Sequence, residues 1–475
     1  MGKYFFLDRG ILVGYHMSNA RIELNKLQKD TCNNPLFGEG FFEEPPLPWE
    51  IRYDNGYPNI IYDPVYQIYR CYYTCITYDE SAAGTPLAER GKTDYKPKEN
   101  RIASLCYAES RDGIHFVKPE LGLTEYAGSR KNNILFRYAH GTGVFLDVQE
   151  TDPKRRYKLM TKVEYNDKCN YMAVGFSEDG IHFGGLIPWP KYNPAADTHN
   201  FVFRDPKTDM FYLYTRIWRN GLRICARSES EDFIHWTEPK EVLRGSGFER
   251  QVYSMPVLPY EGIYLGFASM YHAGDADCAD FDLVDLELAC AANMDDWDFA
   301  APGQHLIERG SGSYPRGAFD CGCIYAAAPI VKEDKVWIYY MGGNGRHTNF
   351  RETSFARGFL ERDKFAGYVQ NNPAKQAQIM TTHFTVYGEN ICLLADIEEG
   401  GCVKAALGTK SGKVYEGYEA KASVLTRGAD GYYQIRFPGK TLEELRSKPV
   451  SLHLYFEKAK VYAVKGDLEN YKLKY

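Results

Sequence analysis

Asp112-Gly-Ile-His-Phe116 is repeated without change as Asp179-Gly-Ile-His-Phe183, and a degenerate copy follows as Asp232-Phe-Ile-His-Trp236. A weaker fourth copy is Asp295-Asp-Trp-Asp-Phe299. The leading aspartates stand at 112, 179, 232 and 295, at intervals of 67, 53 and 63 residues, so one supersecondary unit is repeated. Each copy follows a strand-like run, and Asp-Gly is typical of a tight hairpin turn. The repeat predicts several antiparallel sheets, each with such a turn near its edge.

Pairs of strands recur over the same region. An apolar strand followed by a Tyr-rich strand occurs five times between about residues 50 and 368, and these pairs begin at Asn59, Gly143, Phe201, Pro256 and Ile324. Five units of about four strands each are the number expected of a five-bladed β-propeller. A β-sandwich is the alternative all-β architecture, but it does not explain so long a period.

The chain divides into three parts on this basis. Residues 1–48 form a lead-in that we expect to pack on the propeller, with one helical stretch at Asn19–Lys29. Residues 49–368 hold the repeats. Residues 375–475 alternate more regularly, as in Val450-Ser-Leu-His-Leu-Tyr-Phe456, and predict a separate sandwich. The predicted fold class is therefore all-β, a five-bladed β-propeller followed by a C-terminal β-sandwich.

Charge and hydropathy exclude several partners. The net charge is −6 and the pI is near 6.1, which argues against nucleic-acid binding, because phosphate contacts need a basic face. No run of 18 apolar residues predicts a membrane span. The first residues lack a long apolar segment and a small-residue cleavage site, so a cytoplasmic location is expected.

The twelve cysteines are scattered singly, which is typical of reduced thiols in a cytosolic protein. Two spacings resemble metal ligands, Cys71-x-x-x-Cys75 and Cys321-x-Cys323, but both lie in strand-like runs. No second pair completes a set of four ligands. We therefore expect neither a metal ion nor another cofactor.

Runs over almost the whole chain resemble a group of bacterial proteins described as glycoside hydrolase family 32-like, in the wider set of furanosidase-type five-bladed propellers. The matching runs include Ser110–Leu123, Gly128–Ile134, Asp197–Asn200, Asp285–Leu288, Phe319–Tyr325 and Leu452–Ala463. The resemblance implies a hydrolase with a carbohydrate substrate. It does not identify the sugar.

Glycoside hydrolysis normally uses two carboxyl groups that flank the scissile bond. In the resembled propellers these groups come from the starts of the innermost strands, beside the central axis. The acids nearest those starts are the catalytic candidates Asp54, Asp197, Glu249 and Asp320. The resemblance places Asp197 where the family has its transition-state-stabilising aspartate. Asp54 and Glu249 are displaced by a few residues from the family positions, and Asp54 has the alternative reading of a turn aspartate.

Seven further residues are candidates for substrate binding: His140, His199, Asn200, Arg250, Asp285, Arg316 and His347. We expect Asp197, Glu249, Asp285 and Asp320 to converge on one axial pocket, because the starts of successive blades meet at the axis. Arg250, Arg316 and His347 are expected at its rim. In this hypothesis Glu249 is the general acid, and Asp320 or Asp54 is the base or nucleophile.

The predicted function is hydrolysis of a small glycoside or of an oligosaccharide end. Two alternatives remain open at this point, along with the oligomeric state. One is a carbohydrate-binding propeller without catalysis. The other is phosphorolysis, in which Arg250, Arg316, Arg346 and His347 would hold phosphate in place of water. The repeated His115 and His182 are expected to be structural, because identical residues in several blades cannot all line one asymmetric site.

Overall fold

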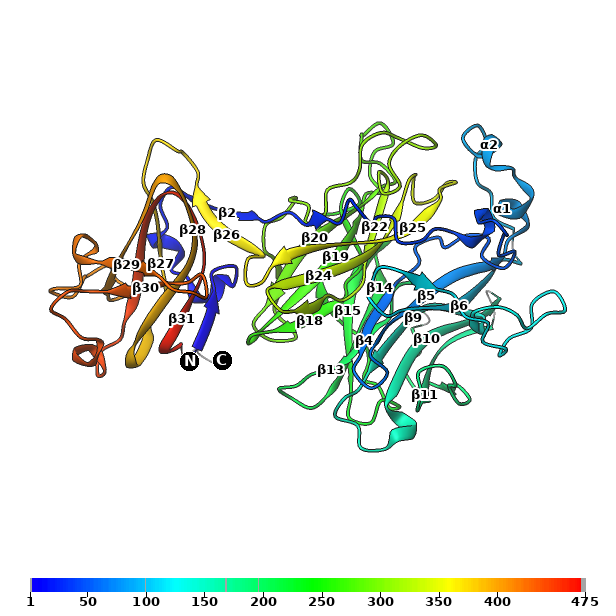
Figure 1. The fold of residues 1–475 in the computed structure, drawn as a ribbon, viewed down its shortest axis with the longest axis horizontal. Coiled ribbons are helices and arrows are strands. Elements are labelled where there is room, and N and C mark those ends of the chain that lie inside the picture. The colour runs from blue at the N-terminus through cyan, green and yellow to red at the C-terminus, as the bar shows by residue number, and fades with distance from the viewer. Residues whose placement is uncertain (1, 99, 167–168, 195, 471–475) are drawn as a thin grey trace.

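The computed structural model describes residues 2–98, 100–166, 169–194 and 196–470. Two all-β parts lie side by side along the long axis of the molecule (Figure 1). One is a five-bladed β-propeller and the other is a C-terminal β-sandwich, so the predicted fold class is confirmed. The only α-helices in the described residues are two short ones, α1 (Glu80–Gly84) and α2 (Leu87–Arg90), which extend blade one.

Each blade is built from four antiparallel strand positions with its first strand innermost, and a parallel bridge between Val284 and Cys323 joins blades four and five into one ten-stranded sheet. Blade one is β4 (Asn59–Asp63), β5 (Ile68–Tyr78), β6 (Ile102–Ser110) and β7 (Phe116–Val117), with β8 (Ile134–Arg137) also paired to β6. Blade two is β9 (Ala139–Leu146), β10 (Tyr157–Asn166), β11 (Cys169–Ser177) and β12 (Ile187–Pro188). Blade three is β13 (Phe201–Arg204), β14 (Phe211–Arg219), β15 (Leu222–Ser230) and β16 (Lys240–Leu243).

The innermost strand is interrupted in blades four and five. In blade four, β17 (Gln251–Ser254) and β18 (Val257–Tyr260) both pair with β19 (Ile263–Tyr271), followed by β20 (Val284–Ala291) and β21 (Trp297–Phe299). In blade five, β22 (Cys323–Ala326) and β23 (Ile330–Lys332) pair with β24 (Lys335–Gly343), followed by β25 (Thr353–Glu361). The outer strand of blade five is β3 (Gln28–Lys29), supplied by the lead-in.

This strand order fixes what lies at each end of the blades. The innermost strands begin at one end of the propeller, and the hairpins that join second to third strands return to that same end. The turns between third and fourth strands lie at the opposite end. The repeated Asp-Gly-Ile-His-Phe turns are of this second kind, since they follow β6, β11 and β15.

The repeated turn is built by side chains that bond to the backbone. Asp112 Oδ1 accepts hydrogen bonds from the backbone of Ile114 and His115 at 2.8 and 2.9 Å, and Ser110 Oγ accepts from Gly113 N at 2.9 Å. His115 Nδ1 lies 2.7 Å from Asp112 Oδ2. Only the second position of the turn, Gly113 with φ +73°, is left-handed. The aspartate therefore acts through its carboxylate and not through a positive φ.

Tyrosines on second strands anchor these turns to the preceding blade. Tyr72 on β5 donates to Gly180 O of the next blade at 2.9 Å, and Tyr339 on β24 donates to Gly113 O at 3.0 Å. The second bond joins blade five to blade one, so the same contact that links neighbours also closes the ring. A Cβ on Gly180 would lie 2.7 Å from Tyr72 Oη, which explains why the turn carries glycine there.

The exposed histidines of these turns give a first prediction. His115→Ala and His182→Ala should each lower the free energy of unfolding by less than about 1 kcal/mol, because each ring makes only an exposed contact with its aspartate. Turnover should be unchanged, because both turns lie at the end of the blades away from the starts of the inner strands. Denaturant unfolding and steady-state kinetics test this together. Loss of turnover with normal stability would contradict it.

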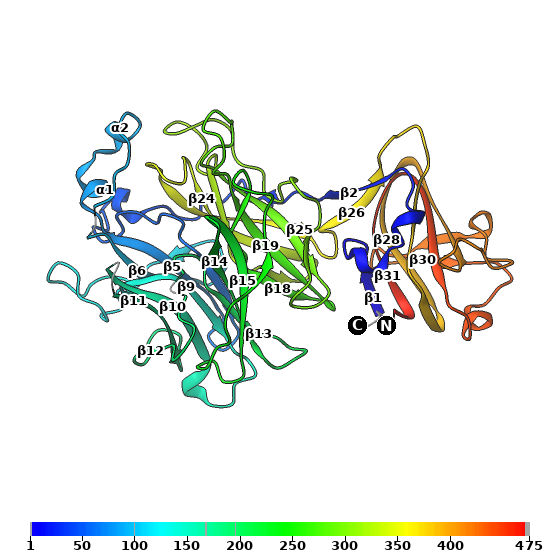
Figure 2. The same ribbon diagram turned by 180° about the vertical axis from the view of Figure 1, so that it is seen from behind.

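The sandwich is formed by strands from both ends of the chain (Figure 2). Its strands are β1 (Gly2–Phe5), β2 (Ala20–Leu24), β26 (Ala366–Gln370), β27 (Ala377–Met380), β28 (Phe384–Gly408), β29 (Val424–Arg427), β30 (Tyr433–Arg436) and β31 (Ser451–Asn470). The predicted helix at Asn19–Lys29 is wrong, because this stretch forms β2 and β3. Its residues alternate, with Leu24 buried and Arg21 exposed, and β2 pairs with β26 over five residues.

The propeller and the sandwich share a continuous hydrophobic cluster. Leu265 and Ile338 of the propeller and Ala463 of the sandwich belong to it. Asp363 bonds both parts: it accepts from Tyr260 of the propeller at 2.6 Å and from Tyr432 of the sandwich at 2.7 Å. Such a shared, largely apolar boundary holds two domains in one arrangement.

Candidate active site

A pocket of about 260 Å³ lies at the axis, at the end where the inner strands begin. Every blade contributes to it, either through the start of its inner strand or through the hairpin between its second and third strands. The lining residues are Arg52, Asp54, Asn55, Tyr57, Tyr95, Pro97, Arg101, His140, Asp197, Arg216, Trp218, Arg223, Tyr253, His347 and Thr348. Four of the candidate residues line this pocket together, namely Asp54, His140, Asp197 and His347.

Asp54 stands in a tight turn before β4. Asp54, Gly56 and Tyr57 have φ values of +56°, +67° and +41°, and Gly56 N donates to Tyr53 O at 2.9 Å. This turn brings the displaced aspartate to the pocket. Both of its guanidinium contacts are made by Oδ1, with Arg351 at 2.7 Å and Arg52 at 3.3 Å, while Oδ2 has no hydrogen-bond partner among the described residues.

The electrostatics of Asp54 follow from these contacts. Burial raises its pKa, but the guanidinium groups of Arg351 and Arg52 outweigh burial and hold the pKa well below the usual range. The carboxylate is therefore held in its ionised form. It can accept a proton or attack an electrophilic carbon, and it cannot serve as a proton donor.

Asp197 precedes β13 and is half exposed. Its Oδ1 pairs with Arg216 on β14, and Arg216 itself is almost fully buried. Tyr57 donates its hydroxyl to the backbone oxygen of Asp197 at 3.2 Å. The carboxylate is thus fixed in orientation toward the same pocket as Asp54.

His140 on β9 is held from behind by a carboxylate. Its Nδ1 lies 2.7 Å from Glu164 Oε2, and Lys162 Nζ lies 2.7 Å from Glu164 Oε1. Burial raises the pKa of Glu164, but His140 and Lys162 outweigh it and hold this pKa well below the usual range. An ionised Glu164 only accepts hydrogen bonds, so Nδ1 carries the proton and Nε2 is left for a ligand.

His347 is held as a neutral ring. Burial lowers the pKa of His347 well below its usual value, and the charge of Arg351 lowers it further. Tyr325 Oη lies 2.7 Å from Nδ1 of His347, and the backbone N–H of His347 donates to Asp282 O at 2.7 Å. His347 therefore contributes shape and hydrogen bonding to the pocket, and no positive charge.

The three other carboxylates expected at the axis do not line this pocket. Glu249 is exposed, and its backbone oxygen is 2.7 Å from His272 Nδ1. Asp285 lies on the third strand of blade four and is bonded by His272 at 2.9 Å and Arg309 at 2.7 Å. Asp320 turns toward Lys29 of the outer strand, at 2.6 Å. The predicted convergence of Asp197, Glu249, Asp285 and Asp320 is wrong, because each of the last three is engaged elsewhere or faces solvent.

Four predicted binding residues also lie outside the pocket. Arg250 pairs with Glu287 and covers the ring of Phe299 at 4.2 Å, and Arg316 is exposed. His199 is buried with Nε2 3.0 Å from Asn59 Oδ1, and burial lowers its pKa to about 3. The side-chain amide of Asn200 donates hydrogen bonds to backbone oxygens, including Gly141 O at 3.1 Å. These side chains support the pocket walls or the blade surfaces and do not face a ligand.

Sequence inspection missed the arginines and aromatic rings of the pocket. Arg216, Trp218 and Arg223 come from one hairpin, Arg216-Ile-Trp-Arg-Asn-Gly-Leu-Arg223, whose Asn-Gly turn was a usable signal. Trp218 is 55 % exposed, so its ring is available for stacking against a sugar face. Tyr95 and Arg101 come from the long connection after α2, which no periodic pattern identifies.

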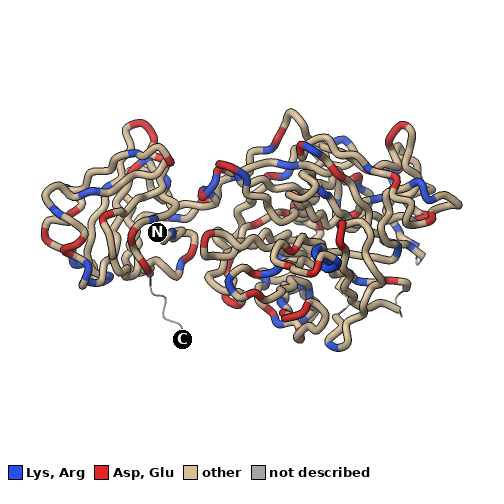
Figure 3. The backbone as a smooth tube through the Cα atoms, turned by 60° about the horizontal axis from the view of Figure 1, so that its bottom comes forward, with Lys and Arg blue, Asp and Glu red and all other residues tan. Residues whose placement is uncertain are grey.

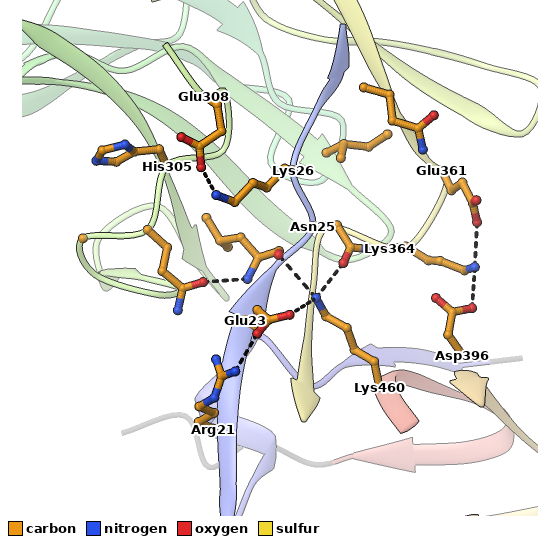
Figure 4. Close-up of a pocket in the computed structure, with 15 residues that line it drawn as sticks. Arg21, Glu23, Asn25, Lys26, His305, Glu308, Glu361, Lys364, Asp396 and Lys460 are labelled. Carbon is orange, nitrogen blue, oxygen red and sulfur yellow. Dashed lines mark hydrogen bonds and ion pairs between the residues drawn. The ribbon is translucent and has the colours of Figure 1, made fainter. Parts of the chain in front are cut away.

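A larger cavity of about 590 Å³ lies between the propeller and the sandwich (Figure 4). Its charges are balanced. The cations are Arg21, Lys26, Lys364 and Lys460, and the acids are Glu23, Glu308, Glu361 and Asp396. They are paired with one another, as Arg21 is with Glu23 at 2.8 Å and Lys364 with Asp396 at 2.7 Å. This cavity is a salt-bridged boundary with no unmatched group to recognise a ligand.

No three His, Cys, Asp or Glu side chains are grouped so that they could hold a metal ion, within the ranges that the structure describes. Among the same residues, none of the helices has the length and apolar character needed to cross a membrane.

The fold and the pocket together define an all-β propeller with a polar axial site. No protein-family profile matches the chain, and no curated protein matches it in sequence. Solved structures do match. A glycosyl hydrolase from Bacteroides ovatus is 15 % identical, with 72 % of this chain and 95 % of that chain covered and a TM-score of 0.46.

Two further solved structures are similar at the same level. A thermostable family-43 glycoside hydrolase is 15 % identical over 65 % of this chain and 90 % of its own, with a TM-score of 0.44. An N-acetylgalactosamine deacetylase from F. plautii, in complex with blood group B trisaccharide, is 13 % identical. The match covers 72 % of this chain and 96 % of that chain, with a TM-score of 0.45. The similar structures thus include several glycoside hydrolases.

Proposed function

We propose that the protein is a glycoside hydrolase of the family 32-like propeller type, acting on a small glycoside or an oligosaccharide end in the axial pocket. The observation that carries the proposal is Asp54, an ionised carboxylate with one oxygen free at the start of blade one. A nucleophile or general base must be ionised at the operating pH, and Arg351 and Arg52 provide for this. The resembled enzymes use an aspartate near this place.

The second role is proton donation to the leaving oxygen. The two lining carboxylates, Asp54 and Asp197, are both paired with arginine, so neither is arranged as a protonated acid. His140 is the lining group that is arranged to transfer a proton, since Glu164 fixes its Nδ1 and leaves Nε2 toward the pocket. We assign His140 as the proton donor in its imidazolium form, in which Glu164 holds Nδ1–H and the second proton, on Nε2, passes to the glycosidic oxygen as the bond to the sugar breaks.

Asp197 has the third role in this proposal. Glycosidic cleavage passes through a transition state with positive charge on the sugar ring. A carboxylate beside that ring stabilises the charge without forming a bond. Asp197 is half exposed and is held by Arg216 and by its contact to Tyr57, as such a positioned group requires.

A panel of aryl furanosides and pyranosides tests this function directly. We expect release of the aryl alcohol from at least one glycoside. The alcohol is measured by its absorbance, and the free sugar is identified by chromatography. Each assay is run with and without inorganic phosphate, so that a sugar phosphate product would reveal phosphorolysis. A panel without any product, for a protein that still binds sugars, would contradict catalysis.

A carbohydrate-binding propeller without catalysis is the second candidate. The observation that favours it is the ion pairing of both lining aspartates, together with the absence of glutamate from the lining residues of the described pocket. In that case Trp218, which is 55 % exposed, would hold the sugar by stacking. Calorimetric binding with no turnover is the result that would select this candidate.

A further inference from the structure

We propose that the axial pocket recognises a sugar that carries an anionic group, such as a uronate carboxylate or a sulfate or phosphate ester. This inference rests on the proposed function only for the location of the sugar. It names the class of substrate, which the carboxylates alone do not determine.

The first argument is the charge of the pocket walls. Four arginines line the pocket, Arg52, Arg101, Arg216 and Arg223, against two carboxylates, Asp54 and Asp197. His347 is neutral and adds no positive charge. Elsewhere along the chain, basic and acidic residues are interspersed over both domains (Figure 3). The excess of positive charge is therefore a property of this pocket and not of the molecule, whose net charge is −6.

The second argument is that the arginines are not all neutralised by the protein. Arg223 forms no salt bridge with any described residue. Arg101 forms none either, but the charges of Asp54 and Asp79 act on it: burial lowers the pKa of Arg101, and these carboxylates outweigh burial and raise it. Arg223 Nη1 reaches only the amide oxygen of Gln251, at 3.4 Å, and Arg101 reaches only Tyr95 Oη, at 3.5 Å. An unmatched guanidinium is costly when it is removed from water, and an anionic ligand group would offset that cost.

The third argument is the set of buried nitrogen atoms without a hydrogen-bond partner. Nε and Nη1 of Arg52, Nη1 of Arg216 and Nε of Arg223 all belong to it. Arg52 and Arg216 are 1 % and 4 % exposed. Buried donors in folded proteins are nearly always paired. These unpartnered nitrogens show that the guanidinium groups of Arg52, Arg216 and Arg223 have hydrogen-bonding capacity that the described residues do not use.

The fourth argument is the packing of the guanidinium groups against aromatic rings. Arg52 lies 4.2 Å from the ring centre of Tyr95, and Arg223 lies 4.6 Å from each of Trp218 and Tyr271. A guanidinium within about 6 Å of a ring centre is attracted to the ring and loses freedom of movement. This packing therefore fixes the arginines before a ligand arrives, so little side-chain entropy is lost on binding.

The test compares acidic sugars with their neutral counterparts. Calorimetry at low salt would measure binding of glucuronate and galacturonate beside glucose and galactose, of glucose 6-phosphate and glucose 6-sulfate, and of inorganic phosphate alone. We expect at least one acidic sugar to bind ten-fold or more tightly than its neutral form, and this preference to shrink as salt is raised. Equal binding of acidic and neutral forms would overturn the proposal. So would tight binding of inorganic phosphate with no preference among sugars, because the arginines would then serve phosphate itself.

A pair of variants from one hairpin controls for folding. Arg223→Gln removes a pocket arginine that holds no ion pair, and the acidic sugar should lose ten-fold or more in affinity. Arg219→Gln removes an exposed arginine that pairs with Glu241, outside the pocket, and should leave affinity unchanged. If Arg223→Gln does not fold, Arg101→Gln provides the same comparison. Equal effects of pocket and control variants would overturn the proposal.

Failure of this inference is distinguishable from failure of the proposed function. Turnover of neutral glycosides with no preference for acidic ones would contradict the inference about anionic sugars and would still support the proposed hydrolase function. Preferential binding of acidic sugars without turnover of their aryl glycosides would support the inference about anionic sugars and would contradict the proposed hydrolase function. The binding assay needs no catalysis, so each result is read separately.

Discussion

Asp54→Asn is expected to lower kcat by about 10²–10⁴-fold on any glycoside that the protein hydrolyses, because the amide keeps the shape of the side chain and removes its charge. The free Oδ2 can no longer accept a proton or form a bond to the sugar. Steady-state kinetics on the purified variant measure the effect. KM should change less than kcat, because the lost interaction is one made in the transition state.

Asp320→Asn is the matched control for this variant. Like Asp54, Asp320 is a carboxylate in an ion pair, with Lys29 at 2.6 Å, but it is fully buried and lies outside the pocket. Both variants leave a cation without its partner, so both should lose stability, while only Asp54→Asn should lose turnover. Full activity of Asp54→Asn, or equal loss in both variants, would contradict the assigned role.

Glu50→Ala is expected to cause the largest loss of stability of any change considered, about 3–5 kcal/mol, because it removes a fully buried carboxylate that accepts hydrogen bonds from a lysine, two tyrosine hydroxyls and a backbone amide. Glu50 is fully buried and accepts from Gly40 N at 2.9 Å, Tyr53 Oη at 2.7 Å and Lys118 Nζ at 2.8 Å. Tyr73 Oη donates to its other oxygen. The network joins the lead-in to blade one beside Asp54. Denaturant unfolding of the natural protein and of Glu50→Ala measures the difference in their free energies of unfolding.

Glu43→Ala is the control for Glu50→Ala. Glu43 also pairs with Lys118, at 2.9 Å, but it is 44 % exposed, so its loss should cost less than about 1 kcal/mol. Equal costs for both variants would contradict the assignment of the effect to burial.

The ion pair of Lys118 with Glu50 predicts that the stability of the fold depends on pH. Burial lowers the pKa of Lys118, but Glu50 and Glu43 outweigh burial and raise it. A raised pKa stabilises the fold fully below the pKa of unfolded lysine, about 10.4, and this contribution is lost as pH rises through the higher value of the folded state. Stability of the natural protein should therefore fall above about pH 10, and this part of the fall should be absent in Glu50→Ala.

The propeller could be predicted from the sequence because its signals are local and repeated. The turn at Asp112 and the strand pair at Asn59 each depend on residues within one blade, and their recurrence gives the number of blades. The stretch at Asn19–Lys29 was mistaken for a helix, because the partners that make it a strand lie more than 300 residues away, at β25 and β26. Pairing of that kind leaves no local pattern.

The site could be predicted only in part, for a different reason. Asp54 and Asp197 were found because acids near the start of an inner strand tend to face the axis. Glu249 and Asp320 satisfy the same rule and fail, because side-chain direction also depends on the local turn and on nearby cations such as Lys29. The arginines of the β14–β15 hairpin were missed, since a rule that seeks acids gives no weight to the second and third strands.

The pairing of β3 with β25 has a consequence for how the protein is made. A ribosome releases Gln28 and Lys29 long before Gly358 and Phe359, the residues with which they pair. Blades one to four can form as they emerge, whereas blade five must wait for nearly the whole propeller sequence and then recover a strand from the start of the chain. β1 waits still longer, for β31. Contacts of such high sequence separation slow folding, so we expect a late, slow closure in which the first thirty residues remain open to proteolysis.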